Sequence, residues 1–366
     1  MVKIKRSGIF VNLALVIIST IFTLLLSEVA IRFLGQTTMY VSPERDRFWR
    51  YDSLLGWTHQ PGQNGVFVTP QFRTAVSINS QGLRDREYSY ERQNGKQRIL
   101  ILGDSFAWGY GVEEHQRFSE LLESSLGVEA INAGVSGYST DQELIWFRNV
   151  GINYSPDLVI VVFAGNDIGD NSRDLVSNIY HKPKFVLEND QLVQKNYPVP
   201  RTSPQGKFVY YFSQHSAFFY FLVQRYFDIL TIYRDSRINT NGLAFNEADT
   251  STADKPFVLT LTLLQEIQKI AASRDAKFLI VATDSWWNGP SGWSYNDFID
   301  ELHSQGFLVL DVQSTPGFMP GTMLIPDDGH WNAAGHEFVA GKIKKYIESD
   351  QLLIQAQNQV GKPNGQ

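Results

Sequence analysis

From residue 98 onward the chain alternates short apolar runs with amphipathic stretches, and this alternation constrains the fold more than any other feature. Each apolar run is hydrophobic at consecutive positions, which is typical of a strand buried on both faces in a parallel sheet. The stretches between the runs have helical spacing, and Thr140 with Glu143 has the pattern of a capping box. The sequence therefore predicts an α/β fold, a three-layer α/β/α sandwich with a central parallel sheet. The runs that predict its strands are RILILGD, VEAINAG, DLVIVVFAGND, KFLIVATD and FLVLDV.

A long uncharged segment lies close to the N-terminus. Residues 8–26 carry no charge, and as a helix they would extend about 28 Å, close to the roughly 30 Å hydrocarbon core of a bilayer. A cleaved signal peptide has a shorter apolar region followed by a small-x-small site, and Glu28 interrupts the nearest such site, SEVA. We expect residues 1–35 to form an uncleaved N-terminal transmembrane helix, with a cleaved signal segment as the alternative.

The charges that flank this segment favour one orientation. Lys3, Lys5 and Arg6 precede it, and cations beside an apolar helix favour the cytoplasmic side. Arginines at 45–50 weaken this bias. We expect a single-pass membrane protein with its N-terminus in the cytoplasm and the α/β domain on the periplasmic or extracellular side.

The rest of the chain divides by composition. Residues 36–97 are rich in turn formers and predict a lead-in subregion with short strands near 66–68 and 75–78. The α/β domain covers residues 98–350, and residues 351–366 form a polar tail.

An insertion at about 170–255 interrupts the α/β domain and is too long for an ordinary connection. It contains the aromatic stretch SAFFYFLVQRYFDILTIY. We expect these rings to pack the insertion onto the core of the domain, and a lid or a membrane-surface contact is the alternative.

Composition excludes several classes of function. The net charge is −6 and no basic stripe occurs in the body of the chain, so we expect no nucleic-acid partner. The chain has no Cys, which removes disulfides, thiol catalysis and Cys-ligated zinc.

The turn in ILILGDSFAWGYG, at 99–111, is the first candidate for chemistry. It is not a phosphate loop, because nothing basic lies between Gly103 and Arg117, and it lacks a G-x-G-x-x-G pattern. Ser105 follows a predicted strand, and ligands of such sheets bind at the carboxyl ends of the strands. This position suits a nucleophile, which needs a base for its proton and donors for the oxyanion.

Residues after the other strands supply these groups. The second strand ends in NAGVSGYST, a glycine turn with backbone N–H groups, and the third ends in AGND, with the side-chain amide of Asn166. PDDGHWNAAGH follows the last strand and puts carboxylates and His330 in one loop. A histidine that acts as a base needs a carboxylate on its other ring nitrogen.

The blocks GDSF, GVSGYS, GND and DDGH occur here in the order and at the strand ends that are typical of the SGNH/GDSL hydrolase superfamily, the GDSL-like lipases and acylhydrolases. The resemblance covers about residues 98–350. It implies a flavodoxin-like α/β/α fold with Ser105 as nucleophile and His330 as general base. It also implies an oxyanion hole formed by the backbone N–H groups of Ser105 and Gly137 and by the side chain of Asn166.

The acid of this constellation has two candidates. The family's usual acid stands three residues before the histidine, which is Asp327. Asp328 stands two before, the spacing in related polysaccharide acetyltransferases that also carry His-Trp. The sequence favours Asp327, with Asp328 as the alternative.

Other residues near these motifs have structural interpretations. We expect Asp104 to tie the turn by hydrogen bonds. His336 with His330 suggests a metal site, but their spacing places them on different helical faces and we reject it, so no metal or other cofactor is expected. Trp108, Trp286 and Trp287 are expected to be packing residues, with lining of the crevice as the alternative.

These observations predict a membrane-anchored serine ester hydrolase that works through an acyl-enzyme. We expect the substrate to be an acylated small molecule or glycan, with short acyl esters of cell-envelope or secreted glycans preferred. One alternative is a polysaccharide O-acetyltransferase with the same triad. Another is a non-catalytic envelope protein that binds or assembles glycans on a hydrolase scaffold. The membrane is the partner of the N-terminal helix, and the sequence identifies no protein partner.

Overall fold

The structure, a computed structural model, describes residues 6–35, 38, 45–92, 95–176, 180–240, 255–287, 289 and 292–353. The chain divides into two compact units. The larger unit contains residues 42–201 and 250–366, and the smaller contains residues 1–41 and 202–249. The polar tail lies outside the described residues from 354 onward.

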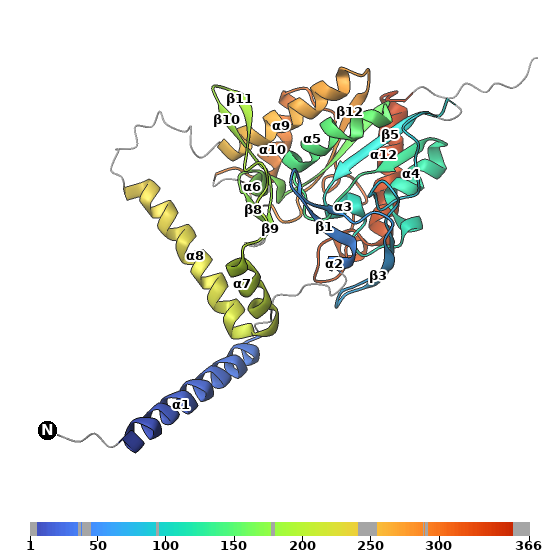
Figure 1. The fold of residues 1–366 in the computed structure, drawn as a ribbon. Coiled ribbons are helices and arrows are strands. Elements are labelled where there is room, and N and C mark those ends of the chain that lie inside the picture. The colour runs from blue at the N-terminus through green and yellow to red at the C-terminus, as the bar shows by residue number, and fades with distance from the viewer. Residues whose placement is uncertain are drawn as a thin grey trace, which may run out of the picture. The chain divides into compact units, whose positions relative to one another are not determined.

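A five-stranded parallel sheet forms the centre of the larger unit (Figure 1). The strands lie in the order β13-β12-β7-β5-β6, and in register Ile101 is opposite Ile160, which is opposite Leu279. This is a doubly wound sheet whose strand order reverses between β5 and β7, where ligands of such folds bind. The predicted α/β fold is confirmed. The strands are β5 (Arg98–Gly103), β6 (Glu129–Asn132), β7 (Leu158–Ala164), β12 (Lys277–Thr283) and β13 (Val309–Asp311).

Helices cover both faces of the sheet, because alternate residues of the buried strands point to opposite sides. Val159 and Val161 of β7 pack with α5, α9 and α10, whereas Ile160 and Val162 pack with α4 and α12. Each of these fully buried side chains stabilises the fold by about 1.5–3 kcal/mol. The helices are α4 (Phe118–Leu126), α5 (Thr140–Asn149), α9 (Lys255–Ala272), α10 (Tyr295–Ser304) and α12 (Ala333–Ser349).

The lead-in subregion belongs to the same unit as the sheet. It forms two antiparallel hairpins, and the second confirms the two short predicted strands. Phe48, Phe67 and Val76 pack with Trp108, which follows the first strand of the sheet. The elements are α2 (Arg45–Phe48), β1 (Trp49–Asp52), β2 (Gly56–His59), β3 (Asn64–Val68) and β4 (Arg73–Ser77).

Short elements complete the larger unit, and the hairpins β8-β9 and β10-β11 come from the first part of the insertion. Phe185 of β10 is buried in the core of the larger unit. The short elements are α3 (Ser105–Trp108), η1 (Glu114–Gln116), η2 (Gly151–Tyr154), α6 (Asp167–Asn171), β8 (Leu175–Val176), β9 (Tyr180–His181), β10 (Lys184–Glu188), β11 (Gln191–Lys195) and α11 (Pro320–Met323).

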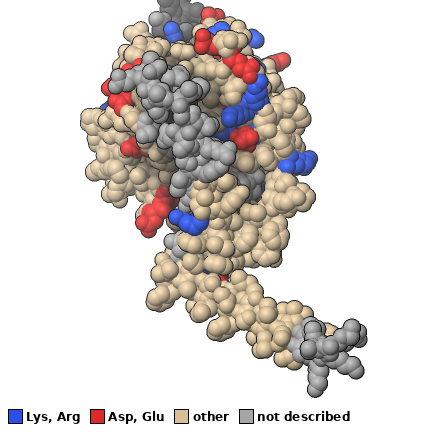
Figure 2. Space-filling model, turned by 90° about the vertical axis from the view of Figure 1, so that its left-hand side faces the viewer, with Lys and Arg blue, Asp and Glu red and all other residues tan. Residues whose placement is uncertain are grey.

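The described part of the smaller unit contains three helices, α1 (Arg6–Phe33), α7 (Pro204–His215) and α8 (Ala217–Thr240). The expectation that the aromatic stretch packs onto the α/β core is wrong, because α8 carries this stretch and packs with α1 and α7. Among the described residues, one helix is long and apolar enough to cross a membrane, Phe10–Phe33, with a mean hydropathy of 2.3. Its surface is free of charged side chains over most of its length (Figure 2).

Candidate active site

Ser105 lies in the sharp turn between β5 and α3. Gly103 ends the strand with a φ of 151°, and a Cβ at this glycine would lie 2.7 Å from Ala107 Cβ and 3.0 Å from Val162 Cβ. The turn therefore requires glycine at this position. Asp104 caps the short helix that follows, since its carboxylate accepts a hydrogen bond of 2.9 Å from the Phe106 N–H. The expectation that Asp104 ties the turn is confirmed.

The structure brings Ser105 into contact with His330, which is 225 residues away along the chain. Ser105 Oγ lies 2.7 Å from His330 Nε2, and the two residues are 7% and 8% exposed. On the other side of the ring, His330 Nδ1 contacts Asp328 Oδ1. Hydroxyl, imidazole and carboxylate thus form a continuous hydrogen-bonded chain that can carry a proton away from the serine.

The carboxylate at His330 belongs to Asp328 and not to Asp327, the residue that the sequence favours. The Asp328 N–H donates to the Ile325 carbonyl in a tight turn, and the Asp328 carboxylate accepts from the His330 backbone N–H at 3.2 Å. Asp327 is exposed and has a left-handed φ of 59°. The turn therefore directs the second carboxylate, not the first, back toward the ring.

Aromatic rings enclose the imidazole of His330. Tyr110 stacks on it with ring centroids 4.3 Å apart and an interplanar angle of 29°, and Phe106 lies at 5.0 Å. Trp286 meets it edge-on at 4.5 Å and is 44% exposed. Of the three tryptophans considered from the sequence, Trp286 lies at the site, whereas Trp108 is buried and Trp287 packs on the core.

This enclosure changes the pKa values of the pair. Burial lowers the pKa of His330 below its usual range, although the Asp328 carboxylate opposes this effect. Burial raises the pKa of Asp328, but the hydrogen bond and charge of His330 outweigh burial and hold that pKa below its usual range. At neutral pH the ring is therefore neutral and the carboxyl is ionised, which are the states that a general base and its orienting acid require.

The candidate oxyanion donors follow the two strands that flank β5. Gly137 lies in a half-buried turn after β6, with a φ of 82°, and Trp57 Nε1 donates to the neighbouring Ser136 carbonyl. Asn166 follows β7, and its Nδ2 donates to Asp170 Oδ2 at 3.1 Å. That bond uses one of the two N–H groups of the amide. Asn166 thus follows the strand across the reversal point from β5, and Gly137 follows the strand on the other side of β5.

Two carboxyl groups at or near the nucleophile turn, Asp104 and Glu143, are buried. Burial raises the pKa of Asp104 to about 7, and the charge of Asp170 adds to this rise. Glu143 is 2% exposed and neither carboxylate oxygen has a hydrogen-bond partner, so the capping box expected at Thr140 is absent. Burial, together with the charge of Asp104, raises the pKa of Glu143 well above its usual range. Burial therefore favours the protonated, neutral forms of both groups.

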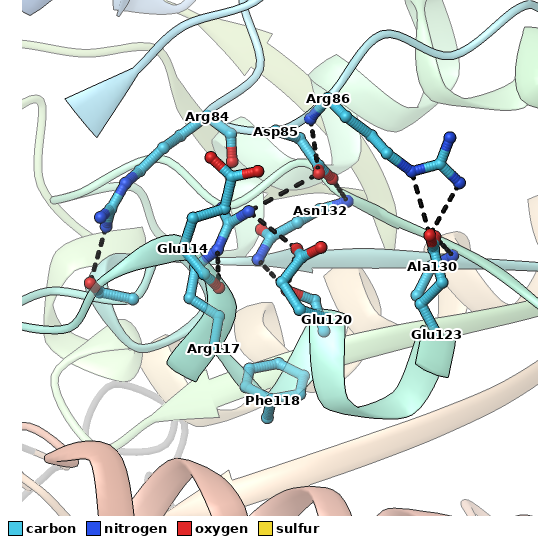
Figure 3. A network of polar contacts seen from close by, with 12 residues as sticks. Arg84, Asp85, Arg86, Glu114, Arg117, Phe118, Glu120, Glu123, Ala130 and Asn132 are labelled. Carbon is cyan, nitrogen blue, oxygen red and sulfur yellow. Dashed lines mark hydrogen bonds and ion pairs between the residues drawn. The ribbon is translucent and has the colours of Figure 1, made fainter. Parts of the chain in front are cut away.

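A buried arginine supports the loop that follows Ser105 (Figure 3). Arg84 Nη1 donates to the Trp108 and Gly109 carbonyls at 3.0 and 2.7 Å, and Arg84 Nη2 donates to the Val112 carbonyl at 2.8 Å. The Arg84 carbonyl in turn accepts from Arg117 Nη1. Arg84 comes from the lead-in subregion, which therefore helps to fix the loop of the site.

Arg117 balances the acidic side chains of the same network. Its Nη2 lies 2.8 Å from Glu120 and 3.6 Å from the fully buried Asp85 (Figure 3). Asp85 and Glu120 also form, with Glu114, a group of carboxylates close enough to hold a metal ion. The guanidinium of Arg117 already supplies the positive charge there, so we interpret this cluster as structural.

His336 has a packing role. It is buried, its Nδ1 accepts from the Phe118 N–H at 3.3 Å, and its ring stacks on Phe118 at 5.8 Å with an angle of 9° between the planes. Burial lowers its pKa to about 3. A neutral ring with these partners stabilises the start of α4.

The sheet order and the serine, imidazole and carboxylate contacts are those of an α/β hydrolytic enzyme with its serine at the point where the strand order reverses. Residues 101–196 match the GDSL-like Lipase/Acylhydrolase family model. This stretch of the α/β domain is similar to the GDSL-like lipases and acylhydrolases, a family of carboxylic ester hydrolases. The matched residues include Ser105, Gly137 and Asn166, whereas His330 lies beyond them.

Solved structures resemble the chain at low sequence identity. TesA is 13% identical with a TM-score of 0.37, and the match covers 70% of this chain and 100% of TesA. The psychrotrophic esterase EstA from Pseudoalteromonas sp. is 13% identical with a TM-score of 0.38, covering 70% and 99%. A two-domain esterase active on acetylated mannans, CEX, is 14% identical with a TM-score of 0.39, covering 71% and 50%. No curated protein sequence matches the chain.

Proposed function

We propose that the protein is a membrane-anchored serine ester hydrolase in which Ser105 is the nucleophile, His330 the general base and Asp328 the orienting acid. One observation carries the proposal: Ser105 Oγ lies 2.7 Å from His330 Nε2, and the opposite ring nitrogen contacts a carboxylate. A buried serine with no base beside it would remain a weak nucleophile.

The reaction proceeds in two halves. His330 takes the proton of Ser105 as Oγ attacks the ester carbonyl, and the oxyanion receives hydrogen bonds from the N–H groups of Ser105 and Gly137 and from the Asn166 amide. The imidazolium, stabilised by Asp328, returns the proton to the leaving alkoxide, which departs as the alcohol. Water then attacks the acyl-enzyme, gives its proton to His330, and releases the carboxylic acid as Ser105 regains its proton.

The substrate we propose is a short acyl ester, such as an acetyl group on a cell-envelope or secreted glycan. The exposed ring of Trp286 beside His330 supports this choice, because aromatic faces bind the apolar faces of sugars. The proposed location supports it as well. We propose that α1 crosses the membrane with its N-terminus in the cytoplasm and the catalytic domain on the periplasmic or extracellular side.

A polysaccharide O-acetyltransferase is the second candidate. The observation in its favour is the contact of His330 with Asp328, which is two residues before it, followed by a buried Trp331. This D-x-H-W arrangement resembles that of polysaccharide acetyltransferases. In that case a sugar hydroxyl, not water, would accept the acyl group from Ser105.

The test uses the full chain in nanodiscs with p-nitrophenyl esters from acetate to laurate. We expect activity on the short esters and a fall of at least ~10³-fold in Ser105→Ala, with Ser124→Ala, an exposed serine on α4, as the matched control. Release of acetate that depends on an added oligosaccharide, with acetyl recovered on it, would favour the transferase.

A reactive phosphonate probe separates a wrong substrate from a missing activity. An adduct on the Ser105 peptide without ester turnover would retain the nucleophile and move the search to other acyl groups. No adduct and no turnover would overturn the proposal and leave the non-catalytic glycan-binding role.

A further inference from the structure

The helix α7 exposes an apolar face. Phe208, Tyr211 and Phe212 are 55%, 55% and 38% exposed, and their spacing of three and four residues places them on one side of the helix. Phe208 and Phe212 contact each other with ring centroids 4.4 Å apart. Such a face is the half of an amphipathic helix that normally lies against a core.

The next helix, α8, has a matching face. Leu222, Tyr226, Ile229 and Leu230 are 47%, 59%, 64% and 40% exposed, and they follow the i, i+4, i+7, i+8 pattern of one helical stripe. Phe219, one turn earlier, lies 5.6 Å from Phe212 of α7, so the two helices share aromatic contacts. We call α7 and α8 together the aromatic hairpin. Clustered exposed apolar side chains of this kind mark a binding surface.

Glu28 of α1 joins this hairpin to the apolar N-terminal helix. Its carboxylate accepts hydrogen bonds from the backbone N–H groups of Ala217 and Phe218, both at 2.9 Å, and from the Ser216 hydroxyl at 2.7 Å. Arg32, one turn along α1, pairs with the same carboxylate at 2.6 Å. A carboxylate at the first N–H groups of a helix is the preferred arrangement for a helix N-terminus. A segment removed as a signal peptide would take this cap with it.

The position of Glu28 along α1 determines how deep in the bilayer the aromatic hairpin begins. The uncharged residues 8–26 extend about 28 Å as a helix and fill the hydrocarbon core of a bilayer. Glu28 and Arg32 then lie just beyond that core, at the headgroups. Because Glu28 caps α8, the turn between α7 and α8 lies at the same level.

The composition of the hairpin suits this level. Phe, Tyr and Leu side chains form its exposed faces, and the exposed cations Lys207 and Arg225 accompany them. Aromatic rings favour the membrane interface, and basic side chains can extend to anionic headgroups while their stems cover apolar surface.

We propose that the aromatic hairpin is a second membrane attachment, which lies in the interface of the bilayer that α1 crosses and buries its apolar faces among the lipids. Phospholipid covers these faces, because α8 contacts α1 and the uncharged surface of α1 requires lipid around it. The inference rests on the proposed anchoring by α1. The chain passes between the two units after residues 41, 201 and 249. Three connections therefore link the larger unit to the smaller unit, which contains α1 and the aromatic hairpin.

The experiment uses the absence of Cys in the chain. Single cysteines replace Leu222 and Ile229 on the hairpin, Phe22 on α1 as the positive control, and Tyr90, a 44% exposed aromatic residue of the larger unit, as the matched control. Each full-length variant is labelled with an environment-sensitive fluorophore in vesicles of phosphatidylcholine and phosphatidylglycerol. Quenching is then measured with lipids that carry a nitroxide near the headgroup and with aqueous iodide.

We expect labels at Leu222 and Ile229 to be quenched by the lipid nitroxide at least about as strongly as the label at Phe22, and to be shielded from iodide relative to Tyr90. Iodide quenching equal to that of Tyr90, with Phe22 still quenched by lipid, would overturn the hairpin proposal and retain the anchor. Shielding from both quenchers would also overturn it, because the faces would then be covered by protein, a second copy of this chain or another polypeptide. Absence of lipid quenching at Phe22 would contradict the anchoring itself, whatever the esterase assay shows.

Discussion

Asp328 is joined twice to His330, once through the ring Nδ1 and once through the backbone N–H. The second bond restricts the rotation of the carboxylate, so less conformational entropy is lost when the first bond forms. Asp327, its neighbour, is exposed and has a positive φ. The same substitution at these two adjacent residues is therefore expected to have different effects on activity.

Asp328→Asn is expected to lower kcat/KM by about 10²–10⁴-fold, because an amide cannot stabilise the imidazolium that forms during attack. Asp327→Asn, the matched control, should retain activity within about threefold, since an exposed side chain stabilises no group in the transition state. Steady-state kinetics on p-nitrophenyl acetate measures both. A larger loss in Asp327→Asn than in Asp328→Asn would mean that the loop rearranges when substrate binds.

The pH profile of kcat/KM is the second prediction. Burial lowers the pKa of His330, and the ring must be neutral to accept the Ser105 proton. Activity should therefore rise with pH along an acid limb whose midpoint lies below about 6.5, the ordinary value for histidine. Asp328 opposes the effect of burial, so the residual activity of Asp328→Asn should have a limb displaced to still lower pH. A wild-type midpoint above 6.5 would contradict the burial of the free enzyme's imidazole.

The sheet could be predicted from the sequence because it depends on local pattern, and the pairing of Ser105 with His330 could be predicted from the family resemblance. Five apolar runs predict the five strands, and each strand end predicts which side chains meet at the crevice. Ser105, Gly137, Asn166 and His330 all follow strands or lie in the loop after the last strand. The family resemblance groups them, and the structure shows the contact between Ser105 and His330.

The choice between Asp327 and Asp328 could not be predicted in this way, because it depends on the φ of one residue in a tight turn. The pairing of Glu28 with Ser216 was equally inaccessible, since the two are 188 residues apart and belong to segments with no common motif. The aromatic stretch of α8 was expected in the α/β core for the same reason. Hydrophobicity predicts that a face must be covered, but it does not predict by what.

Substitution of Arg117 tests the buried polar network that supports the loop after Ser105. Its side chain is fully buried between Asp85 and Glu120, and burial raises the pKa of Asp85 to about 8 even though the Arg117 charge opposes this rise. Arg117→Ala would remove the only cation that pairs with the buried Asp85 among the described residues, and the donor to the Arg84 carbonyl, at a cost of about 3–5 kcal/mol and a fall in Tm of at least about 6 °C. Arg86→Ala, which removes a partly exposed ion pair with Glu123, should cost less than about 1 kcal/mol. Thermal unfolding followed by tryptophan fluorescence compares them, and equal losses would contradict the structural role given to Arg117.

Glu143 gives a prediction about stability and pH. Its folded pKa is raised by burial above the value of about 4.5 in the unfolded chain, so the folded protein keeps the proton to higher pH. Stability is therefore fully present below that unfolded pKa and falls as pH rises toward the folded pKa. Glu143→Gln has no carboxyl to ionise and does not lose stability in this way. The difference in Tm between Glu143→Gln and wild type should therefore increase as pH rises from about 5 to about 8.

Glu123→Gln provides a control of opposite sign. Burial raises the pKa of Glu123, but the hydrogen bond from Arg86 and those that accompany it outweigh burial and lower that pKa. This carboxylate stabilises the fold above the unfolded pKa and loses its effect as pH falls. The Tm of Glu123→Gln relative to wild type should therefore decrease as pH rises toward 4.5, the unfolded value, and stay constant between about pH 5 and about pH 8. If both variants changed in the same direction, the trend would reflect the net charge of the protein and not the environment of either carboxyl.

Glu28 is the last test, and it separates the clamp between α1 and α8 from the catalytic site. Glu28→Ala removes the carboxylate that accepts from the Ala217 and Phe218 N–H groups, whereas Glu28→Gln keeps one of the two oxygens. Loss of a helix cap costs about 0.5–2 kcal/mol, which corresponds to about 2- to 30-fold faster amide exchange in the first turn of the helix. Hydrogen exchange with mass spectrometry, on the full chain in nanodiscs, should show this acceleration around Ala217 in Glu28→Ala, a smaller one in Glu28→Gln, and unchanged hydrolysis of p-nitrophenyl acetate in both. Unchanged exchange in Glu28→Ala would mean that packing alone holds α8 to α1, because the first N–H groups of α8 would then be protected without their carboxylate.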